Sequence, residues 1–131
     1  KTMLELGQER DELSVVCDQV GSPTYAMDLA EFVMMIAQEA ECRERDFPTS
    51  ILNFSSEGVC SWFDFAKTIF ELQGIKCRVI PVETSEYPTQ AIRPHYSVLS
   101  KAKVKEQYTF QVPYWKSSVK RCLEAIKSAS E

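Results

Sequence analysis

The chain has 131 residues, of which 44% are hydrophobic and 26% are charged, and its formal net charge is -4. This length and composition fit one compact domain and exclude a collagen-like or mainly disordered chain. The acidic balance, without a cluster of lysines and arginines, argues against a nucleic-acid partner. No apolar run is long enough to span a bilayer and no secretory signal pattern is present, so we expect a cytoplasmic protein without membrane contact.

The cysteines favour reduced thiols over disulfides, because they are odd in number and form no Cys-x-x-Cys pair. The one histidine, His95, has no cysteine within a dozen residues, so the ligand spacing of a zinc site is absent. We therefore expect mostly buried free thiols and no metal site. The cysteines are Cys17, Cys42, Cys60, Cys77 and Cys122.

The first segments predict a helix end followed by a strand. Residues 1–8 resemble the last turns of a helix whose start is missing, and Gly7 could close it. Residues 13–16 form a short run rich in valine that is typical of a strand buried on both faces.

A turn at residues 21–24 leads into a helix that begins near Tyr25. Its apolar residues recur at helical spacing, and Asp28 in its first turn complements the helix dipole. The acidic stretch 39–46 is most simply a solvated helix end and loop. Residues 51–54 then predict a second short strand.

Ser61 and Asp64 predict the capping box of a further helix, and Gly74 should end it. Residues 78–82 read as a strand that Pro81 places at an edge or an end of a sheet. The apolar face of the helix is formed by Trp62, Phe65, Ala66, Ile69 and Phe70.

The last third contains an ordered but irregular segment at residues 84–94 and a short helical turn within residues 98–107. A final helix begins near Pro113. This alternation indicates an α/β fold with short strands and three main helices. The buried stripe of the final helix is expected at Val119, Cys122, Leu123 and Ile126.

Four stretches of the chain carry a recognisable pattern: residues 18–26 with 28–30, then 58–66, 86–89 and 93–99. In sequence and in order they resemble the dTDP-4-dehydrorhamnose reductases, which are extended short-chain dehydrogenase/reductases. The resemblance covers about two thirds of the chain.

The resemblance implies a role in reducing dTDP-4-dehydro-L-rhamnose to dTDP-L-rhamnose. In that family an N-terminal Rossmann half binds NAD(P)H, and C-terminal segments bind the nucleotide sugar. Residues 1–131 would then be the C-terminal substrate-binding region, a single compact unit without the Rossmann half. Its partners would be the dTDP-sugar substrate and that missing half, and NAD(P)H would not bind this region alone.

The residues needed for hydride transfer are not found in the sequence. A pyrophosphate cradle needs a glycine-rich turn that opens a helix, and the four glycines form none. A keto reductase of this class also needs a tyrosine with a lysine four residues later, and no tyrosine here has one. We expect no catalytic and no cofactor-binding residue in this chain, which should be inactive alone.

The turn that connects the first predicted strand to the helix beginning near Tyr25 is the leading candidate for substrate contact. Small side chains and free backbone N–H groups there suit the approach of a polar ligand, although a plain capped turn has the same composition. Because the family's nucleotide-sugar site borders this stretch, the resemblance favours binding. The residues are Gln19, Gly21, Ser22, Pro23 and Thr24.

Arg93 and Ser97 are the second group of candidates. A guanidinium suits a diphosphate through paired N–H donors, and a surface arginine is the plainer alternative. Trp62 is more often a core residue at such a position, with a smaller chance of bordering the sugar. His95 has no identifiable partner and receives no catalytic role.

Two other hypotheses remain open. The chain could belong to a non-catalytic binding or regulatory module of the same fold, which a missing Tyr-x-x-x-Lys in the longer protein would support. An apolar face that normally packs on the Rossmann half could also drive formation of a homo-oligomer.

Overall fold

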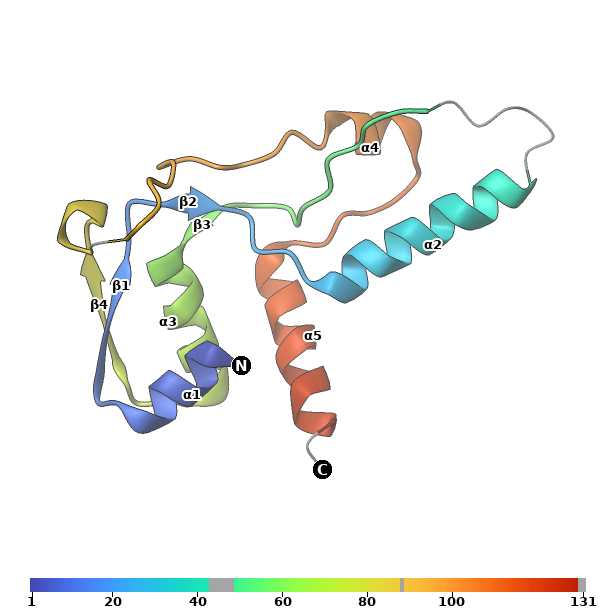
Figure 1. Ribbon diagram of the computed structural model, residues 1–131. Helices are drawn as coiled ribbons and strands as arrows, with labels where there is room; N and C mark the ends of the chain where they lie inside the picture. The colour runs from blue at the N-terminus through green and yellow to red at the C-terminus, as the bar shows by residue number, and fades with distance from the viewer. Residues whose placement is uncertain (43–48, 88, 130–131) are drawn as a thin grey trace. The chain divides into compact units, whose positions relative to one another are not determined.

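The computed structural model describes residues 1–42, 49–87 and 89–129. They divide into two compact units, each assembled from separate stretches of the chain (Figure 1). Unit 1 contains residues 1–23 and 58–98, and unit 2 contains residues 24–57 and 99–131. Whether both units act as one substrate-binding region stays a prediction.

Unit 1 is built on a pair of parallel strands, β1 (Glu12–Val16) and β4 (Arg78–Val82). Both strands were expected, and the sheet of described residues contains only these two, so each has a free edge. Pro81 is tolerated because an edge strand has N–H positions without a ladder partner. Val15 and Val16 are buried while Ser14 is exposed, so the predicted burial of β1 on both faces holds only in part.

Two helices pack together in unit 1, α1 (Thr2–Glu9) and α3 (Trp62–Gln73), and α3 also contacts both strands (Figure 1). The expectation that Gly7 closes α1 is wrong, because the helix continues to Glu9. A Cβ on Gly7 would lie 2.7 Å from Cε1 of Phe70. The glycine is therefore needed for the close approach of the two helices.

The start and end of α3 follow the prediction. The Ser61 hydroxyl accepts a hydrogen bond from the Asp64 backbone N–H at 3.1 Å, and the Asp64 carboxylate accepts one from the Ser61 backbone N–H at 3.0 Å. Gly74 ends the helix with φ 65°, a left-handed conformation that favours glycine. This capping box fixes the direction in which the helix leaves residue 61.

Unit 2 contains three helices, α2 (Ala26–Cys42), α4 (Ala102–Gln107) and α5 (Trp115–Ser128). The strand expected at residues 51–54 is absent, because residues 49–56 pair with no other strand. Phe54 instead stacks on Phe32 with ring centroids 5.0 Å apart. Tyr108 and Phe110 complete this aromatic cluster around Phe32, so side-chain packing holds the segment where a ladder was expected.

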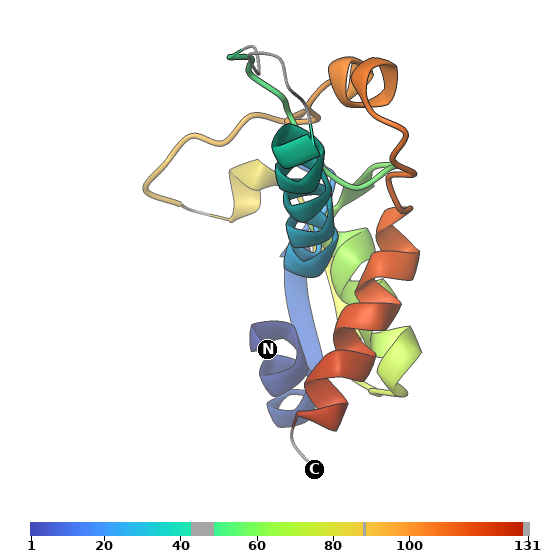
Figure 2. The same ribbon diagram turned by 90° about the vertical axis from the view of Figure 1, so that its right-hand side faces the viewer.

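An ion pair between Asp28 and Arg121 links α2 to α5, the blue-to-teal helix and the red helix in Figure 2. Asp28 is fully buried, and its carboxylate accepts hydrogen bonds from Arg121 and, at 2.5 Å, from the Ser118 hydroxyl. The sequence predicted Asp28 only as a partner of the helix dipole. On α5, Val119 and Leu123 are buried as expected, and Cys122 and Ile126 are half-buried.

The apolar residues that predicted α2 lie mostly on its exposed side. Leu29, Val33 and Met34 have exposed fractions of 41%, 52% and 58%. The helix also extends to Cys42, beyond the expected start of the loop, and residues 43–48 lie outside the described part. This exposed face is compatible with the predicted homo-oligomer, which remains a prediction.

The remaining expectations are met in part. A 3-10 turn (Thr84–Glu86) opens the irregular segment 84–94, in which Pro88 lies outside the described residues. Only two of the five cysteines, Cys60 and Cys77, are buried, and no cysteine is in a disulfide. None of the helices within residues 1–42, 49–87 and 89–129 combines the length and apolar character that a bilayer crossing needs.

Candidate functional site

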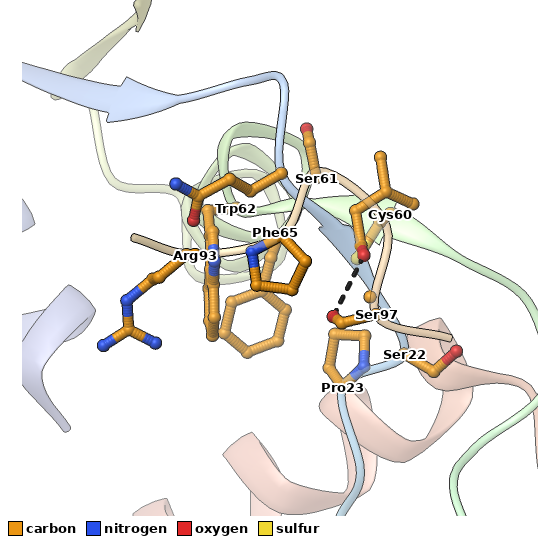
Figure 3. Close-up of a pocket in the computed structure, with 12 residues that line it drawn as sticks. Ser22, Pro23, Cys60, Ser61, Trp62, Phe65, Arg93 and Ser97 are labelled. Carbon is orange, nitrogen blue, oxygen red and sulfur yellow. Dashed lines mark hydrogen bonds between the residues drawn. The ribbon is translucent and has the colours of Figure 1, made fainter. Parts of the chain in front are cut away.

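A cavity of about 300 Å³ opens on unit 1, where three stretches of the chain meet (Figure 3). The short antiparallel strands β2 (Val20–Gly21) and β3 (Cys60–Ser61) form its base. Its other walls come from the first turn of α3 and from residues 93–97. Six of the seven predicted site residues line it: Gln19, Gly21, Ser22, Pro23, Arg93 and Ser97.

The third wall is held against β2 by backbone hydrogen bonds. Val20 N–H donates to the His95 carbonyl at 2.8 Å, and Ser97 N–H donates to the Val20 carbonyl at 2.9 Å. A Cβ on Gly21 would lie 3.2 Å from the Ser97 hydroxyl oxygen, so a larger residue would press on this contact. The small residue at position 21 therefore allows residues 95–97 to lie close to β2.

Asp18 and Thr84 anchor the neighbouring turn, and neither was predicted from the sequence. The Asp18 carboxylate accepts from the Thr84 hydroxyl at 2.7 Å and from its backbone N–H at 3.0 Å. The Thr84 hydroxyl and N–H hold the pKa of the Asp18 carboxyl below its ordinary value. Gln19 Nε2 donates to the Thr84 hydroxyl oxygen at 3.0 Å, which connects the anchor to the cavity wall.

His95 is exposed, and its Nδ1 lies 3.1 Å from the Asp18 carbonyl oxygen and 3.4 Å from the carboxylate. Asp18 therefore contacts both Thr84 and the His95 ring. His95 is thus a surface residue whose hydrogen-bonding partner, Asp18, was not identified from the sequence.

The predicted polar side chains of the cavity already donate their hydrogen bonds within unit 1. The Ser22 hydroxyl donates to the Gly58 carbonyl at 2.7 Å, and the Ser97 hydroxyl donates to the Val20 carbonyl at 3.2 Å. Their oxygens can still accept. Thr24 belongs to unit 2, where its hydroxyl accepts from the Ser56 N–H at 3.4 Å, and its role stays a prediction.

Arg93 differs from these residues because it is exposed and, within the described part of the chain, has no hydrogen bond or ion pair. Arg93 lines the cavity beside Trp62, and its guanidinium points away from Ser22, Pro23 and Ser97 (Figure 3). A planar group with several N–H donors and a fixed positive charge suits a phosphate or diphosphate. The cavity therefore has one wall that can bind an anion.

Trp62 forms an apolar part of the cavity wall (Figure 3). Its exposed fraction is 49%, so the expectation of a core residue is wrong. As the first residue of α3, it precedes the part of the helix that turns toward the strands, where Ala66, Ile69 and Phe70 are buried. Periodicity placed it on the apolar face without showing that the packed interior begins one turn later.

A glycine-rich turn that opens a helix, the usual pyrophosphate cradle, does not occur among the described residues. Gly7 lies inside α1 and Gly74 ends α3. Gly21 is in β2 and Gly58 precedes β3, so no glycine opens a helix in the described stretches. Those stretches also contain no group of three or more histidine, cysteine or acidic side chains placed to hold a metal ion.

Residues 1–128 match the family model described as the RmlD substrate binding domain. The chain belongs to this family. The resemblance seen in the four sequence stretches is thereby confirmed.

Curated relatives of this domain include the spore coat polysaccharide biosynthesis protein SpsK of Bacillus subtilis (strain 168). It is 37% identical over 131 residues, which cover 100% of this chain and 43% of that protein. The dTDP-4-dehydrorhamnose reductase of Escherichia coli (strain K12) is 34% identical over 132 residues, which cover 96% of this chain and 44% of that protein. The chain thus spans less than half the length of these relatives.

Solved structures give the same result and support the α/β class. A dTDP-4-dehydrorhamnose reductase from Clostridium acetobutylicum ATCC 824 matches with a TM-score of 0.86 and 38% identity, over 96% of this chain and 42% of that one. The enzyme from Bacillus anthracis str. Ames, solved in complex with NADP, matches with a TM-score of 0.82 and 38% identity. That match covers 92% of this chain and 40% of that one.

Proposed function

We propose that this RmlD-type domain binds the nucleotide part of a dTDP-sugar in the cavity of unit 1. The observation that carries the proposal is the guanidinium of Arg93, which pairs with no group in the described part of the chain. It lines a cavity in which the Ser22 and Ser97 hydroxyls already donate within unit 1. Six residues expected to contact substrate line the same cavity. Family membership supplies the substrate class, because relatives of this domain are dTDP-4-dehydrorhamnose reductases.

Arg93 would bind the diphosphate through paired N–H donors. Its position before Pro94 favours an extended backbone at Arg93. The hydrogen bonds of His95 and Ser97 to Val20 fix the following residues against β2. The charge is therefore presented by a segment that is already ordered before ligand arrives, which lowers the entropic cost of binding.

Reduction of the sugar would take place in a longer protein. There, a Rossmann part would bind NAD(P)H and supply a tyrosine that donates a proton and a lysine that lowers the pKa of that tyrosine. This domain would hold the dTDP-4-dehydro-L-rhamnose. The free edge of the β1–β4 pair is suited to such a partner, since parallel strands are normally covered and extended on both sides. A longer protein without Tyr-x-x-x-Lys would support the regulatory alternative instead.

The proposal is tested by calorimetric titration of this chain with dTDP. We expect saturable binding that Arg93→Ala weakens by about tenfold to a hundredfold, because charged hydrogen bonds contribute roughly 1.5–3 kcal/mol each. Arg93→Lys should recover part of the affinity, since it keeps the charge but loses the paired geometry.

Arg10→Ala is the matched control, because it removes one exposed positive charge at the end of α1, outside the cavity. If Arg10→Ala and Arg93→Ala lost dTDP affinity equally, the loss would come from the change in net charge, which would contradict the proposal. Folded wild-type chain that shows no heat with dTDP would contradict it directly.

A further inference from the structure

The exposed indole of Trp62 is unusual for its helix. The residue starts α3, whose later turns bury Ala66, Ile69 and Phe70 to 7% exposure or less. A large aromatic ring left half open in the wall of a cavity leaves apolar area that a ligand can cover. Arg93, whose guanidinium has no partner among the described residues, lines the same cavity.

The indole of Trp62 contacts a second aromatic ring of the same helix. Phe65 meets it edge to face, with ring centroids 6.2 Å apart and an interplanar angle of 80°. The capping box of Ser61 and Asp64 fixes the backbone on either side of Trp62. An aromatic ring that is oriented before binding loses little entropy when a second flat ring stacks on it.

The hydrogen-bonding groups of the cavity favour a flat ring over a hydroxyl-rich sugar at this wall. The Ser22 and Ser97 hydroxyls donate to carbonyls within unit 1, and Gln19 uses one of its two Nε2 N–H groups on Thr84. Together these three side chains offer at most one remaining N–H donor to sugar oxygens. Pro23 and Pro94 add rigid apolar surface near Trp62. A pyrimidine base offers a π face that needs no donor, and stacking is sufficient to hold it.

We propose that Trp62 is the platform on which the pyrimidine base of the nucleotide stacks, while Arg93 binds its diphosphate. This inference rests on the proposed function and adds to it the residue that recognises the base. The nucleotide then has two separable contacts in the cavity, one aromatic and one ionic. The sugar extends away from the indole.

The two contacts can be separated by titrating the chain with dTDP and, in parallel, with inorganic pyrophosphate, which has no base. Trp62→Leu keeps apolar bulk without a π face and should weaken dTDP binding by roughly 5-fold to 100-fold, the range that loss of one base stack produces. It should leave pyrophosphate binding unchanged. Arg93→Ala should weaken both ligands.

Two further variants sharpen the result. Trp62→Phe retains a smaller aromatic face and should lose only a few-fold in dTDP affinity, and it should abolish the quenching of tryptophan fluorescence that dTDP causes in the wild type. Tyr114→Leu is the matched control, because Tyr114 is an aromatic residue of similar exposure, 48%, that does not line the cavity. It should bind dTDP like the wild type.

The wild-type titration separates the two proposals. Wild-type binding of dTDP with unchanged affinity in Trp62→Leu overturns the stacking role alone. A parallel loss of dTDP and pyrophosphate in that variant also overturns it, since Trp62 would then only shape the cavity. Absence of dTDP binding in the folded wild type overturns the proposed function together with this inference.

Discussion

The two units use polar side chains for different purposes. In unit 1, Asp18, Thr84 and Gln19 hold a turn and a strand next to the cavity, and Asp18 and Thr84 are only half-buried. In unit 2, Asp28 and Arg121 join two helices, and the carboxylate is fully buried. Substitutions of polar residues should therefore alter binding in unit 1 and stability in unit 2.

The largest expected effect is in unit 2. Arg121→Ala would leave the Asp28 carboxylate buried with only the Ser118 hydroxyl as a donor, and removing one partner of a buried pair costs about 3–5 kcal/mol. Asp28→Ala should cost less, about 2–3 kcal/mol, because the Arg121 side chain is 42% exposed and can rehydrate. Both changes are measured by urea unfolding followed by tryptophan fluorescence. In a Trp62→Phe background Trp115 is the only tryptophan, so the signal comes from unit 2.

Lys120→Ala is the control for that comparison, because it removes the exposed charge next to Arg121 and should change the free energy of unfolding by less than about 0.5 kcal/mol. If Arg121→Ala were as mild as Lys120→Ala, the ion pair would not hold unit 2 together. None of the three variants should change dTDP affinity in protein that remains folded.

A smaller effect is expected from Gly7→Ala in unit 1. Alanine gains about 1 kcal/mol of helix propensity over glycine, but its Cβ would overlap the ring of Phe70, which is only 3% exposed and has little room to move. Overpacking of this kind costs about 1–3 kcal/mol, so we expect net destabilisation of about 1 kcal/mol. Faster amide hydrogen exchange in α1 and α3 would report it.

Gln8→Ala, on the exposed side of the same helix, should leave exchange rates close to the wild type. Slower exchange in Gly7→Ala would show that propensity outweighs the contact. The helices of unit 1 would then be less tightly packed than the structure indicates.

The smallest effect is confined to acid pH and concerns Asp18. Its pKa in the folded protein is lowered by the Thr84 hydroxyl and N–H, so its contribution to stability is complete above the unfolded value of about 3.9. It is lost as the pH falls through the lower folded value. Asp18→Asn should flatten the fall in the urea midpoint below about pH 4.

Thr84→Val tests the cause of that shift, because it removes the hydroxyl donor and keeps the backbone N–H donor. It should flatten the pH profile in part. A profile in Asp18→Asn identical to that of the wild type would assign the acid sensitivity to other carboxyl groups.

Local signals in the sequence predicted both ends of α3. Ser61, Asp64 and Gly74 act through neighbours three or four positions away, so short-range chemistry is sufficient to place them. The site residues were found through the family resemblance, and Arg93 and Ser97 could be added because they lie in one of its stretches. Asp18 lay in such a stretch as well, but its partner Thr84 is 66 residues away.

Long-range packing was the part that periodicity could not supply. The apolar spacing of α2 predicted a helix, yet Phe32 and Asp28 face the interior of unit 2 while Val33 and Met34 are exposed. The same limit explains Gly7, whose role depends on Phe70, and residues 51–54, where an aromatic cluster replaces a strand ladder. Each of these outcomes depends on a partner far along the chain.

The discontinuous composition of the units also has a consequence for folding. The chain leaves unit 1 after Pro23, returns at Gly58 and leaves again after Val98. β1 pairs with β4 across 66 residues, from Glu12 to Arg78, and such distant pairing slows folding because loop closure must precede the contact. At ribosomal elongation rates of about 5–20 residues per second, β1 would wait roughly 3–13 s for its partner. During that interval Leu13, Val15 and Val16 form an unpaired apolar segment, the type of segment that chaperones protect from aggregation.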